Sequence, residues 1–459
     1  MKEWMTQSLE SLNGFLWGPG MLVFYIGAGL LLTLRTRFFQ VRHFGAAVKS
    51  VFEGMLSERP ADRSGGVSAF QAVATALAGT MGVGNIAGAA AAIAMGGAGA
   101  IFWMWVSAFL GMMTKFAEAV LAVRFRDERG SQKRGGPMYY ISRGLRTEWL
   151  AVMYAVFCLL ACFGVGCMTP AGEVAGAMGE LGVPIPIVSG VISCVCAVVI
   201  FGGIKRIGKL SERIIPILSL LYILFSLVAI LIKATAVPNA VGSIFRDAFD
   251  FGSVGGGVLG FGISRAMRFG LARGVYTNEA GMGSSAIAHA ASGETEPVKQ
   301  GMLGIFEVFL DTFAVTTLTA LVILTAFDGD HGSLALIESG ATAAERAFSA
   351  SFGSFGKIFV AVSMFCFALP SMFGWAYYGE ESLRYIIKDE RRQKGWCMVF
   401  RVLFSAAAAV GALADMSALW SIADVFNGLM AIPNLTALLF LSGVVVKEVK
   451  RYEKNDFRE

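Results

Sequence analysis

The stretch Ala78-Gly79-Thr80-Met81-Gly82-Val83-Gly84-Asn85 lies within an apolar segment long enough to cross a membrane. A glycine costs about 1 kcal/mol relative to alanine inside a helix, so a cluster of glycines this dense predicts a local break in the helix. Unwound backbone at membrane depth is tolerated only where protein or water covers it. The stretch therefore predicts an interrupted helix that lines a cavity.

A second glycine-rich stretch, Gly255-Gly256-Gly257-Val258-Leu259-Gly260-Phe261-Gly262, lies five predicted spans later. Because an odd offset inverts the direction of the second unit, the two stretches predict a pair of inverted five-helix repeats. Paired glycine-interrupted segments in corresponding positions are typical of transporter binding sites. Close packing of helices through small residues is the alternative for any single glycine pair.

The composition of the whole chain is that of a membrane protein. Of its 459 residues, 56% are hydrophobic and 15% are charged, whereas a soluble domain carries about 25% charged residues. These values exclude an ordinary soluble enzyme and a disordered chain. The net charge of +5 comes from short basic runs between apolar segments, which is not the pattern of a nucleic-acid-binding protein.

The predicted fold is all-α, with about 11 transmembrane helices arranged as one extra N-terminal helix followed by the two repeats. Each span needs roughly 20 apolar residues. The spans are centred near Val23, Ala78, Trp105, Leu160, Val195, Leu224, Leu259, Thr317, Met364, Phe404 and Leu435.

Lysine and arginine are concentrated in alternate loops, which predicts the orientation in a cell (inner) membrane. Cytoplasmic loops are enriched in these residues, and the basic loops are 35–63, 124–146, 205–213, 384–394 and 447–458. We therefore expect the N-terminus outside and the C-terminus in the cytoplasm.

The chain divides at these loops into four parts. Residues 1–65 form the N-terminal helix and its cytoplasmic loop, 66–235 the first repeat, 236–446 the second repeat and 447–459 a cytoplasmic tail.

The sequence contains no recognisable catalytic or cofactor motif. The segment Gly203-x4-Gly208-Lys209 resembles a phosphate-binding loop, but Leu210 replaces the Ser or Thr that would hold magnesium. The three histidines are widely separated, and the cysteines lack the paired spacing of zinc ligands. We therefore expect no enzyme activity and no cofactor.

The predicted break also indicates what the cavity would bind. The helix that begins after Gly82 to Asn85 presents free N–H groups and a positive dipole to an anion, while unwound carbonyl groups suit a cation. A zwitterion such as an amino acid satisfies both.

Over nearly its whole length the sequence resembles the alanine or glycine:cation symporter family, also called sodium:alanine symporters. The stretch that begins at Gly96-Gly97-Ala98-Gly99 and continues to Val106 is similar to the diagnostic stretch of that family. Other matching motifs are Gly135-Gly136-Pro137-Met138-Tyr139-Tyr140, Gly202-Gly203-Ile204-Lys205-Arg206-Ile207, Asn278-Glu279-Ala280-Gly281-Met282-Gly283-Ser284, Gly374-Trp375-Ala376-Tyr377-Tyr378-Gly379-Glu380 and Ile422-Ala423-Asp424-Val425-Phe426-Asn427-Gly428.

The resemblance implies a leucine-transporter-like fold and sodium-driven uptake of a small amino acid such as alanine or glycine. The amides of Val83 and Gly84 would meet the substrate carboxylate beside Gly82. The implied sodium ligands are the carbonyls of Ala78 and Met81 with Ser371 at one site, and Thr80 and Asn85 with carbonyls near Gly256 at another. Gly260 and Phe261, at the second glycine stretch, are further candidates for the substrate site, with Phe261 as an apolar lid or as plain packing.

Several positions depart from the family pattern where the substrate site should be. Val83 replaces a usual Thr; Cys167, Pro170 and Gly172 replace Asn, Gln and Asn; and Pro370-Ser371 replaces a Thr-Thr pair. A pocket that loses hydrogen-bonding partners discriminates differently between substrates, so alanine specificity does not carry over directly. Pro170 should also kink the fourth span.

Glu173 is the acidic residue of greatest interest, because a carboxylate deep in a span usually marks an ion or substrate path. It would neutralise the substrate ammonium, hold a cation or carry a proton, unless the fourth span ends early and Glu173 faces water. Five polar residues match family positions: Glu118, Glu307, Asp311, Asp424 and Asn427. We expect the acidic ones to form structural ion pairs, with Lys115, Arg265 and Arg268 as the candidate cations.

Two alternatives to sodium-coupled symport therefore stay open. One is a proton-coupled transporter of a different small solute that uses Glu173, and the other is a membrane sensor that has lost transport. The predicted partners are a small amino acid, sodium and the lipid bilayer, without nucleic acid.

Overall fold

The computed structural model describes residues 2–56, 67–128, 133–249, 265–327 and 340–456. Within these residues the chain is helical, with two isolated β-bridges. The helices of the first half are α1 (Lys2–Leu16), α2 (Pro19–Arg35), α3 (Phe39–Arg42), α4 (Phe44–Leu56), α5 (Ala69–Thr80), η1 (Val83–Asn85), α6 (Ala87–Gly96), α7 (Gly99–Phe125), α8 (Pro137–Tyr140), η2 (Ile141–Leu145), α9 (Glu148–Phe163), η3 (Gly164–Met168), α10 (Thr169–Glu180), α11 (Ile185–Ile200) and α12 (Gly203–Ile232).

The second half begins with short helices that precede the next spans. Its elements are η4 (Ala234–Ala236), α13 (Val237–Ala248), α14 (Arg265–Asn278), α15 (Ala286–Ala290), α16 (Pro297–Val308), η5 (Phe309–Thr316), α17 (Thr317–Ala326), α19 (Gly340–Phe352), α20 (Ser354–Ile386), α21 (Glu390–Leu413) and α22 (Met416–Asp456).

Most of the predicted spans correspond to long apolar helices. Eight helical stretches in the described residues are long and apolar enough to cross a membrane, and the bent pair around the first glycine stretch makes a ninth. Helix α11 is apolar but has only 16 residues. The predicted span near Leu259 lies in 250–264, outside the described residues, so the total of 11 stays a prediction.

The first predicted break is confirmed. Helix α5 ends at Thr80, and the helix that follows, Val83–Gly96, is bent by 53° relative to it. The start of α5 is fixed by Ser68, whose hydroxyl accepts a hydrogen bond from the backbone of Gln71, while the Gln71 side chain accepts one in return. This capping box satisfies two of the free amides at the start of the helix.

The structure describes a second interruption at 279–285, between α14 and α15. Three residues there have positive φ angles: Glu279 at +54°, Gly281 at +90° and Gly283 at +76°. Such angles end a helix and favour glycine. The predicted break at Gly255–Gly262 lies outside the described residues, and the interruption seen here falls instead in the Asn278–Ser284 motif of the family resemblance.

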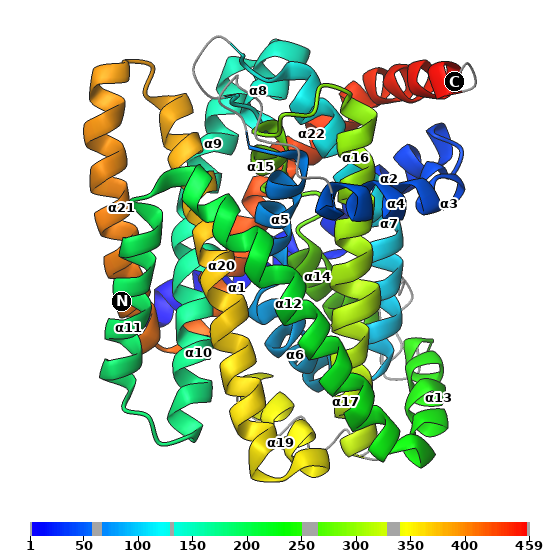
Figure 1. Ribbon diagram of the computed structural model, residues 1–459, viewed down its shortest axis with the longest axis vertical. Helices are drawn as coiled ribbons and strands as arrows, with labels where there is room; N and C mark the ends of the chain where they lie inside the picture. The colour runs from blue at the N-terminus through cyan, green and yellow to red at the C-terminus, as the bar shows by residue number, and fades with distance from the viewer. Residues whose placement is uncertain (1, 57–66, 129–132, 250–264, 328–339, 457–459) are drawn as a thin grey trace.

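The two interrupted helices lie against each other in opposite directions. Helix α5 packs on α15, and α6 packs on α14, so the part before one interruption contacts the part after the other (Figure 1). This crossing is the arrangement expected of two inverted repeats, and it places both interruptions together inside the bundle.

The fourth span is continuous, but its middle is a π-helical turn. Helices α9 and α10 are joined by η3, and together they form one span of 33 residues. Pro170 lies in the first turn of α10, where its missing N–H cannot bond the carbonyl four residues earlier. The predicted distortion is therefore present as a widened turn just before Pro170 rather than as a break of the span.

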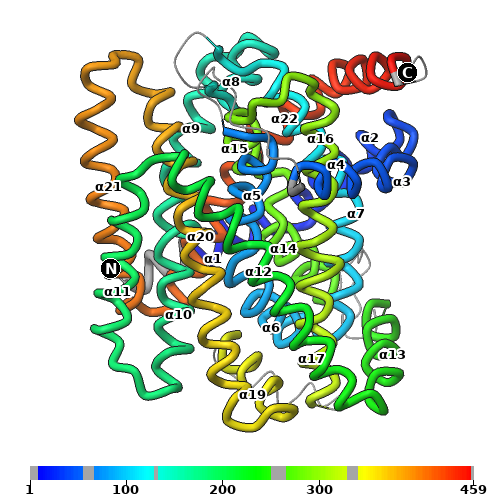
Figure 2. Tube along the Cα trace, viewed as in Figure 1, coloured from blue at the N-terminus to red at the C-terminus, as the bar shows by residue number. Residues whose placement is uncertain are grey.

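The extra N-terminal helix packs on the last helix of the bundle. Helix α1 contacts α22, and α2 contacts α7 and α22. The Trp17 indole donates to the carbonyl of Asp424 at 3.1 Å, and the Asn13 amide donates to that of Ser421 at 3.0 Å. Figure 2 shows that α3, α4, α8 and the end of α22 gather at one end of the bundle, here called the basic end, while α13 and α19 lie at the opposite end.

Candidate substrate and cation site

The first interruption presents two backbone amides without partners. Gly82 N donates to the Thr80 carbonyl at 2.9 Å and to Asn85 Oδ1 at 3.1 Å. No contact among the described residues pairs the amides of Val83 and Gly84. They begin the helix Val83–Gly96, where the first N–H groups have no partner within the helix and the dipole is positive. These two amides can therefore hold a carboxylate.

Carbonyl groups on the other side of the same break are also free. Within the described residues, no hydrogen bond reaches the carbonyl oxygens of Ala78 or Met81. Ser371 of α20 lies next to them, because its hydroxyl donates to the Gly79 carbonyl at 2.9 Å. The structure thus brings the three predicted sodium ligands Ala78, Met81 and Ser371 to one place, and such oxygen ligands suit a hard cation.

Glycine is required at this break because other helices approach it closely. A Cβ on Gly82 would lie 3.0 Å from the Ser371 hydroxyl oxygen, and one on Gly84 would lie 3.3 Å from atoms of both Tyr276 and Thr277. The missing side chains let α14 and α20 touch the backbone of the interruption directly.

The end of α14 lies at this contact and supplies the opposite charge. The carbonyl of Val275 accepts from Glu279 N, but the described residues provide no hydrogen bond to the carbonyls of Tyr276, Thr277 or Asn278. The last carbonyl groups of a helix carry the negative end of its dipole. They can hold an ammonium group, and the side chains of Tyr276 and Thr277 bring this end of α14 against Gly84.

Asn85 connects the first interruption to the π-helical element η5. Its amide nitrogen donates to Asp311 Oδ1 at 2.6 Å and to Thr316 Oγ1 at 3.0 Å. The other Asp311 oxygen accepts from Thr312 Oγ1 at 2.8 Å, and that hydroxyl accepts from Asn278 at 3.3 Å. A chain of hydrogen bonds therefore joins the two interruptions through a fully buried carboxylate.

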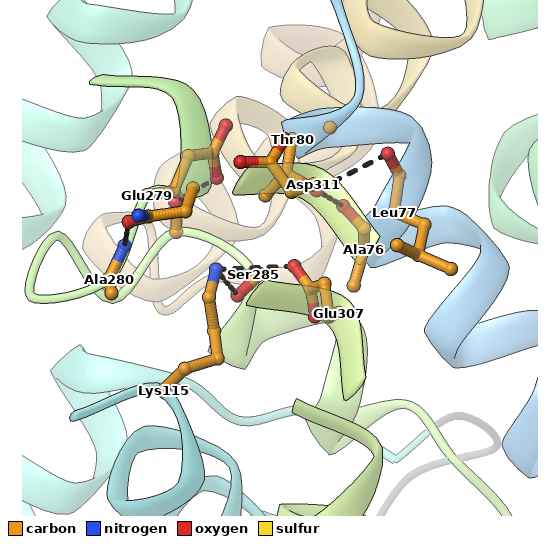
Figure 3. Close-up of polar contacts among 12 residues, drawn as sticks. Ala76, Leu77, Thr80, Lys115, Glu279, Ala280, Ser285, Glu307 and Asp311 are labelled. Carbon is orange, nitrogen blue, oxygen red and sulfur yellow. Dashed lines mark hydrogen bonds and ion pairs between the residues drawn. The ribbon is translucent and has the colours of Figure 1, made fainter. Parts of the chain in front are cut away.

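Thr80 and Asn85, the ligands predicted for the second sodium site, have other contacts in the structure. The Thr80 hydroxyl donates to the carbonyls of Ala76 and Leu77, each at 3.3 Å (Figure 3). Asn85 turns its nitrogen rather than its oxygen toward Asp311. Their role as sodium ligands stays a prediction, as do those of Gly256, Gly260 and Phe261, which lie outside the described residues.

The second interruption is folded around Glu118 of α7. One oxygen of this buried carboxylate accepts from Gly281 N at 2.9 Å, Gly283 N at 3.1 Å and the Asn434 amide at 2.7 Å. Asn434 also donates to the Gly281 carbonyl at 2.9 Å. Glu118 therefore satisfies backbone groups that a continuous helix would have paired by itself.

The candidates on the fourth span lie on η3 and α10, and α10 packs on η1 at the first interruption. The Cys167 thiol donates to the Phe404 carbonyl of α21 at 3.2 Å, and Pro170 is buried in the first turn of α10. Glu173 is 3% exposed and accepts from the Trp420 indole at 2.9 Å, whereas its second oxygen has no hydrogen-bond partner. Trp420 also packs on the ring of Tyr276, the residue that approaches Gly84 at the first interruption. The role of Cys167, Pro170 and Glu173 in substrate binding stays a prediction.

Glu307 and Asp424 form structural ion pairs as predicted, Glu307 with the predicted Lys115 and Asp424 with Arg273, which was not among the predicted cations. Lys115 Nζ lies 3.2 Å from Glu307 Oε1, with both side chains fully buried. Arg273 of α14 makes a two-point contact with Asp424 of α22, at 3.1 and 2.7 Å. The Arg273 guanidinium also lies over the Trp420 ring, 4.7 Å from its centre.

Asp311 and Glu118 are the residues whose place at the interruptions sequence reasoning missed. The sequence predicts structural pairing with a cation for both carboxylates. The structure instead surrounds them with neutral donors. Asp311 has no basic residue one helical turn away in the sequence. This absence is the signal that could have distinguished it from a carboxylate in a structural ion pair.

Comparison with known proteins agrees with this architecture. The model of the sodium:alanine symporter family matches residues 2–459. The sodium/alanine symporter AgcS of Methanococcus maripaludis is 42% identical over 458 residues, which cover 97% of each chain. The putative sodium/proton-dependent alanine carrier protein YrbD of Bacillus subtilis is 35% identical, over 98% of this chain and 93% of that protein.

A solved structure shares the fold. MhsT in complex with L-phenylalanine superposes with a TM-score of 0.58, covering 83% of this chain and 97% of that chain at 13% sequence identity. This likeness confirms the leucine-transporter-like fold that the sequence resemblance implied. Together with the family match over the full length, it establishes that the chain belongs to the sodium:alanine symporter family and is a sodium-coupled amino acid symporter rather than an enzyme.

Proposed function

We propose that this symporter carries a small, alanine- or glycine-like amino acid into the cell together with sodium. The proposal rests on two kinds of free backbone group with opposite partial charge, amide N–H groups at the first interruption and carbonyl groups at the end of α14. The free amides of Val83 and Gly84 lie against the end of α14, where the carbonyls of Tyr276 to Asn278 are free. In an amino acid, the carboxylate can bind the amides while the ammonium group on the same carbon atom binds the carbonyl groups.

The close packing around the interruption favours a small side chain. Tyr276 approaches the backbone at Gly84, and Ser371 approaches it at Gly82. An amino acid bound at this break would meet the Tyr276 and Ser371 side chains, which favours a short side chain. This packing supports a small amino acid as the proposed substrate, and uptake measurements decide between alanine and glycine.

Two places fit sodium by the chemistry of their oxygen atoms. The first is formed by the free carbonyls of Ala78 and Met81 with the Ser371 hydroxyl. The second lies at Asn85, where the buried Asp311 carboxylate adds a negative charge. A monovalent cation at the second place would neutralise a charge that otherwise faces only neutral hydrogen-bond donors.

The basic end of the bundle is proposed to face the cytoplasm. The N-terminus then lies outside and the C-terminus inside, and the boundaries at residues 65, 235 and 446 separate the extra helix, the two repeats and the tail. Rocking of one repeat against the other would expose the site alternately to the two sides. The sodium gradient supplies the drive, and a membrane potential of about 100 mV adds about 2.3 kcal/mol per charge.

The test is uptake of labelled alanine and glycine into proteoliposomes with an inward sodium gradient. We expect accumulation that disappears when choline replaces sodium, and competition by small but not by large amino acids. Binding without accumulation would instead support the sensor alternative. Failure of every small amino acid to bind, measured as thermal stabilisation with sodium present, would contradict the proposal.

Proton coupling through Glu173 is a second candidate, favoured by the buried carboxylate oxygen that has no hydrogen-bond partner. Glu173→Gln keeps the acceptor for Trp420 but cannot bind a proton. If Glu173 couples transport to protons, this variant loses uptake driven by a pH gradient and retains uptake driven by sodium. Glu180→Gln, exposed at the end of the same helix, is the control, and unchanged pH-driven uptake in Glu173→Gln would remove this candidate.

A further inference from the structure

Asn427 of α22 is a buried amide without a hydrogen-bond partner. Its side chain is fully buried, and neither Nδ2 nor Oδ1 is paired within the part of the chain that the structure describes. A buried amide that gives up its bonds to water without replacing them destabilises a fold, and such groups are rare in native proteins. Asn427 is therefore available to a group that the chain does not supply.

Asn427 lies between two contacts that α22 makes with the helix broken at the second interruption. Trp420 precedes it and Asn434 follows it by seven residues, which is about two helical turns and returns to the same face. The Trp420 ring packs on Tyr276 of α14, with 4.8 Å between the ring centres, and the Asn434 amide donates to the Gly281 carbonyl at 2.9 Å. Asn427 is therefore on the face of α22 that runs along the end of α14.

The π-helical element η3, which also packs on α22, offers Asn427 little polar chemistry. A Cβ on Gly164 of η3 would lie 3.5 Å from the Cα of Ala423, one turn before Asn427. The five residues of η3 are Gly164, Val165, Gly166, Cys167 and Met168. The single polar side chain among them, the Cys167 thiol, donates to the Phe404 carbonyl. This neighbour thus leaves both polar groups of Asn427 unpaired.

The end of α14 is the part of the proposed substrate site that would hold the ammonium group. Its last three carbonyls accept no hydrogen bond from the described residues, and Tyr276 approaches the first interruption at Gly84. Asn427 Oδ1 can accept one further N–H of the same ammonium group. Asn427 Nδ2 is then left to donate to a substrate group next to the ammonium group.

A hydroxyl group on the β-carbon of the substrate fits this position. In serine, the ammonium nitrogen and the hydroxyl oxygen are on adjacent carbon atoms. One ammonium N–H can donate to Oδ1 of Asn427 while the hydroxyl oxygen accepts from Nδ2, so that both polar groups of the amide are paired at once. Alanine can pair only the oxygen. The hydroxyl adds a single heavy atom to alanine and so respects the close packing at Gly82 and Gly84.

We propose that Asn427 is a specificity-determining residue of the substrate site, and that the preferred substrate is a small amino acid with a β-hydroxyl group, as in serine. The inference rests on the proposed function and deepens it, because it names the side chain that accompanies the carboxylate and the ammonium group. A site with a buried hydrogen-bond donor discriminates against a substrate that leaves this donor unpaired. Serine is therefore preferred over alanine.

The first test compares serine with α-aminobutyrate, which has the same size but carries a methyl group in place of the hydroxyl. Both compete with labelled alanine for uptake into proteoliposomes under an inward sodium gradient. We expect serine to inhibit at a concentration at least about tenfold lower than α-aminobutyrate. Equal inhibition would mean that a bound water molecule pairs Asn427, and it would overturn the inference without the use of any variant.

The second test is Asn427→Leu, which keeps the approximate volume of the side chain but removes both polar groups. The advantage of serine over α-aminobutyrate should disappear. The substrate-free variant should also unfold at a higher temperature than the unmodified protein, because it lacks an unpaired buried amide. Asn13→Leu, whose amide contacts α22 at the Ser421 carbonyl, is the control and should keep the advantage of serine.

An Asn427→Leu protein that still prefers serine would contradict the role of Asn427. Asn427→Ala removes the same two groups and provides the comparison if the leucine variant does not fold. Alanine separates this inference from the proposed function. If alanine and glycine accumulate with sodium but serine has no advantage over α-aminobutyrate, only the inference is wrong. If alanine, glycine and serine all fail to stabilise the protein against heat with sodium present, the proposed function is wrong as well.

Discussion

The amide nitrogen of Asn85 lies 2.6 Å from a carboxylate oxygen of Asp311, and this contact joins the first interruption to the π-helical element η5. Neither side chain is more than 2% exposed. A carboxylate so placed needs a cation, a proton or several neutral donors. The structure provides donors from Asn85 and Thr312, and a bound sodium ion would complete the set.

Asp311→Asn should therefore weaken sodium activation. It removes the negative charge, and its single oxygen can accept from Asn85 while its amide nitrogen donates to the Thr312 hydroxyl oxygen. We expect the sodium concentration for half-maximal uptake to rise about tenfold, which corresponds to about 1.4 kcal/mol. Glu390→Gln, on the exposed first turn of α21, is the control. Unchanged sodium dependence in a folded Asp311→Asn protein would exclude Asp311 from the sodium site.

Ser371→Ala tests the other proposed sodium position. It removes the hydroxyl that lies on the Gly79 carbonyl beside the free carbonyls of Ala78 and Met81. We expect a several-fold loss of sodium affinity and little change in the amount of folded protein. Ser363→Ala, on the same helix, serves as the control. Equal sodium affinities in the two variants would argue against this site.

Gly84→Ala should abolish most substrate binding, because a Cβ there would lie 3.3 Å from atoms of Tyr276 and Thr277 and would crowd the two free amides. We expect uptake to fall at least about tenfold, a loss of about 1.4 kcal/mol or more. Gly88→Ala is a matched control one turn later, where the added Cβ meets Thr277 at an ordinary 3.6 Å. The prediction fails if both variants transport equally well.

The buried ion pair between Arg273 and Asp424 should stabilise the fold only while both residues are present. Arg273→Met leaves a largely buried carboxylate without its partner, and we expect a loss of about 3 kcal/mol in the free energy of unfolding. Arg273→Met combined with Asp424→Leu should lose clearly less. Chemical unfolding in detergent measures both, and Lys388→Met, from an exposed pair, should change little. A double variant as unstable as the single one would contradict this account.

We expect the free energy of unfolding to depend on pH because of Glu345, which lies on α19 outside the spans. Burial and the neighbouring Glu180 charge raise the pKa of Glu345 to about 7, against about 4.3 in an unfolded chain. The folded state thus binds the proton more tightly, so stability should increase as pH falls from about 7 toward 4.5. Glu345→Gln should be more stable than the unmodified protein at pH 8 and lose that advantage at pH 5. Identical pH profiles would exclude this carboxyl group as the cause.

The position of the first interruption could be predicted from sequence because its cause is local. Gly79, Gly82 and Gly84 weaken the helix by themselves, whatever surrounds them. The second interruption depends on distant residues, since Glu118 and Asn434 pair the backbone of Gly281 and Gly283. Glycine density alone therefore indicates Gly255–Gly262, which lies outside the described residues, and does not indicate the segment that these partners hold open.

The sequence by itself determined the membrane class, the helical architecture, the family and the first broken helix. These features depend on hydropathy, basic loops, glycine content and the order of motifs, which are all local properties of the chain. The tertiary structure decided which oxygen and nitrogen atoms remain free for a ligand. It placed Asp311 beside Asn85, Ser371 beside Gly79, and the carbonyl end of α14 beside Gly84. Those distances depend on how separate helices cross, and no local pattern in the chain contains that information.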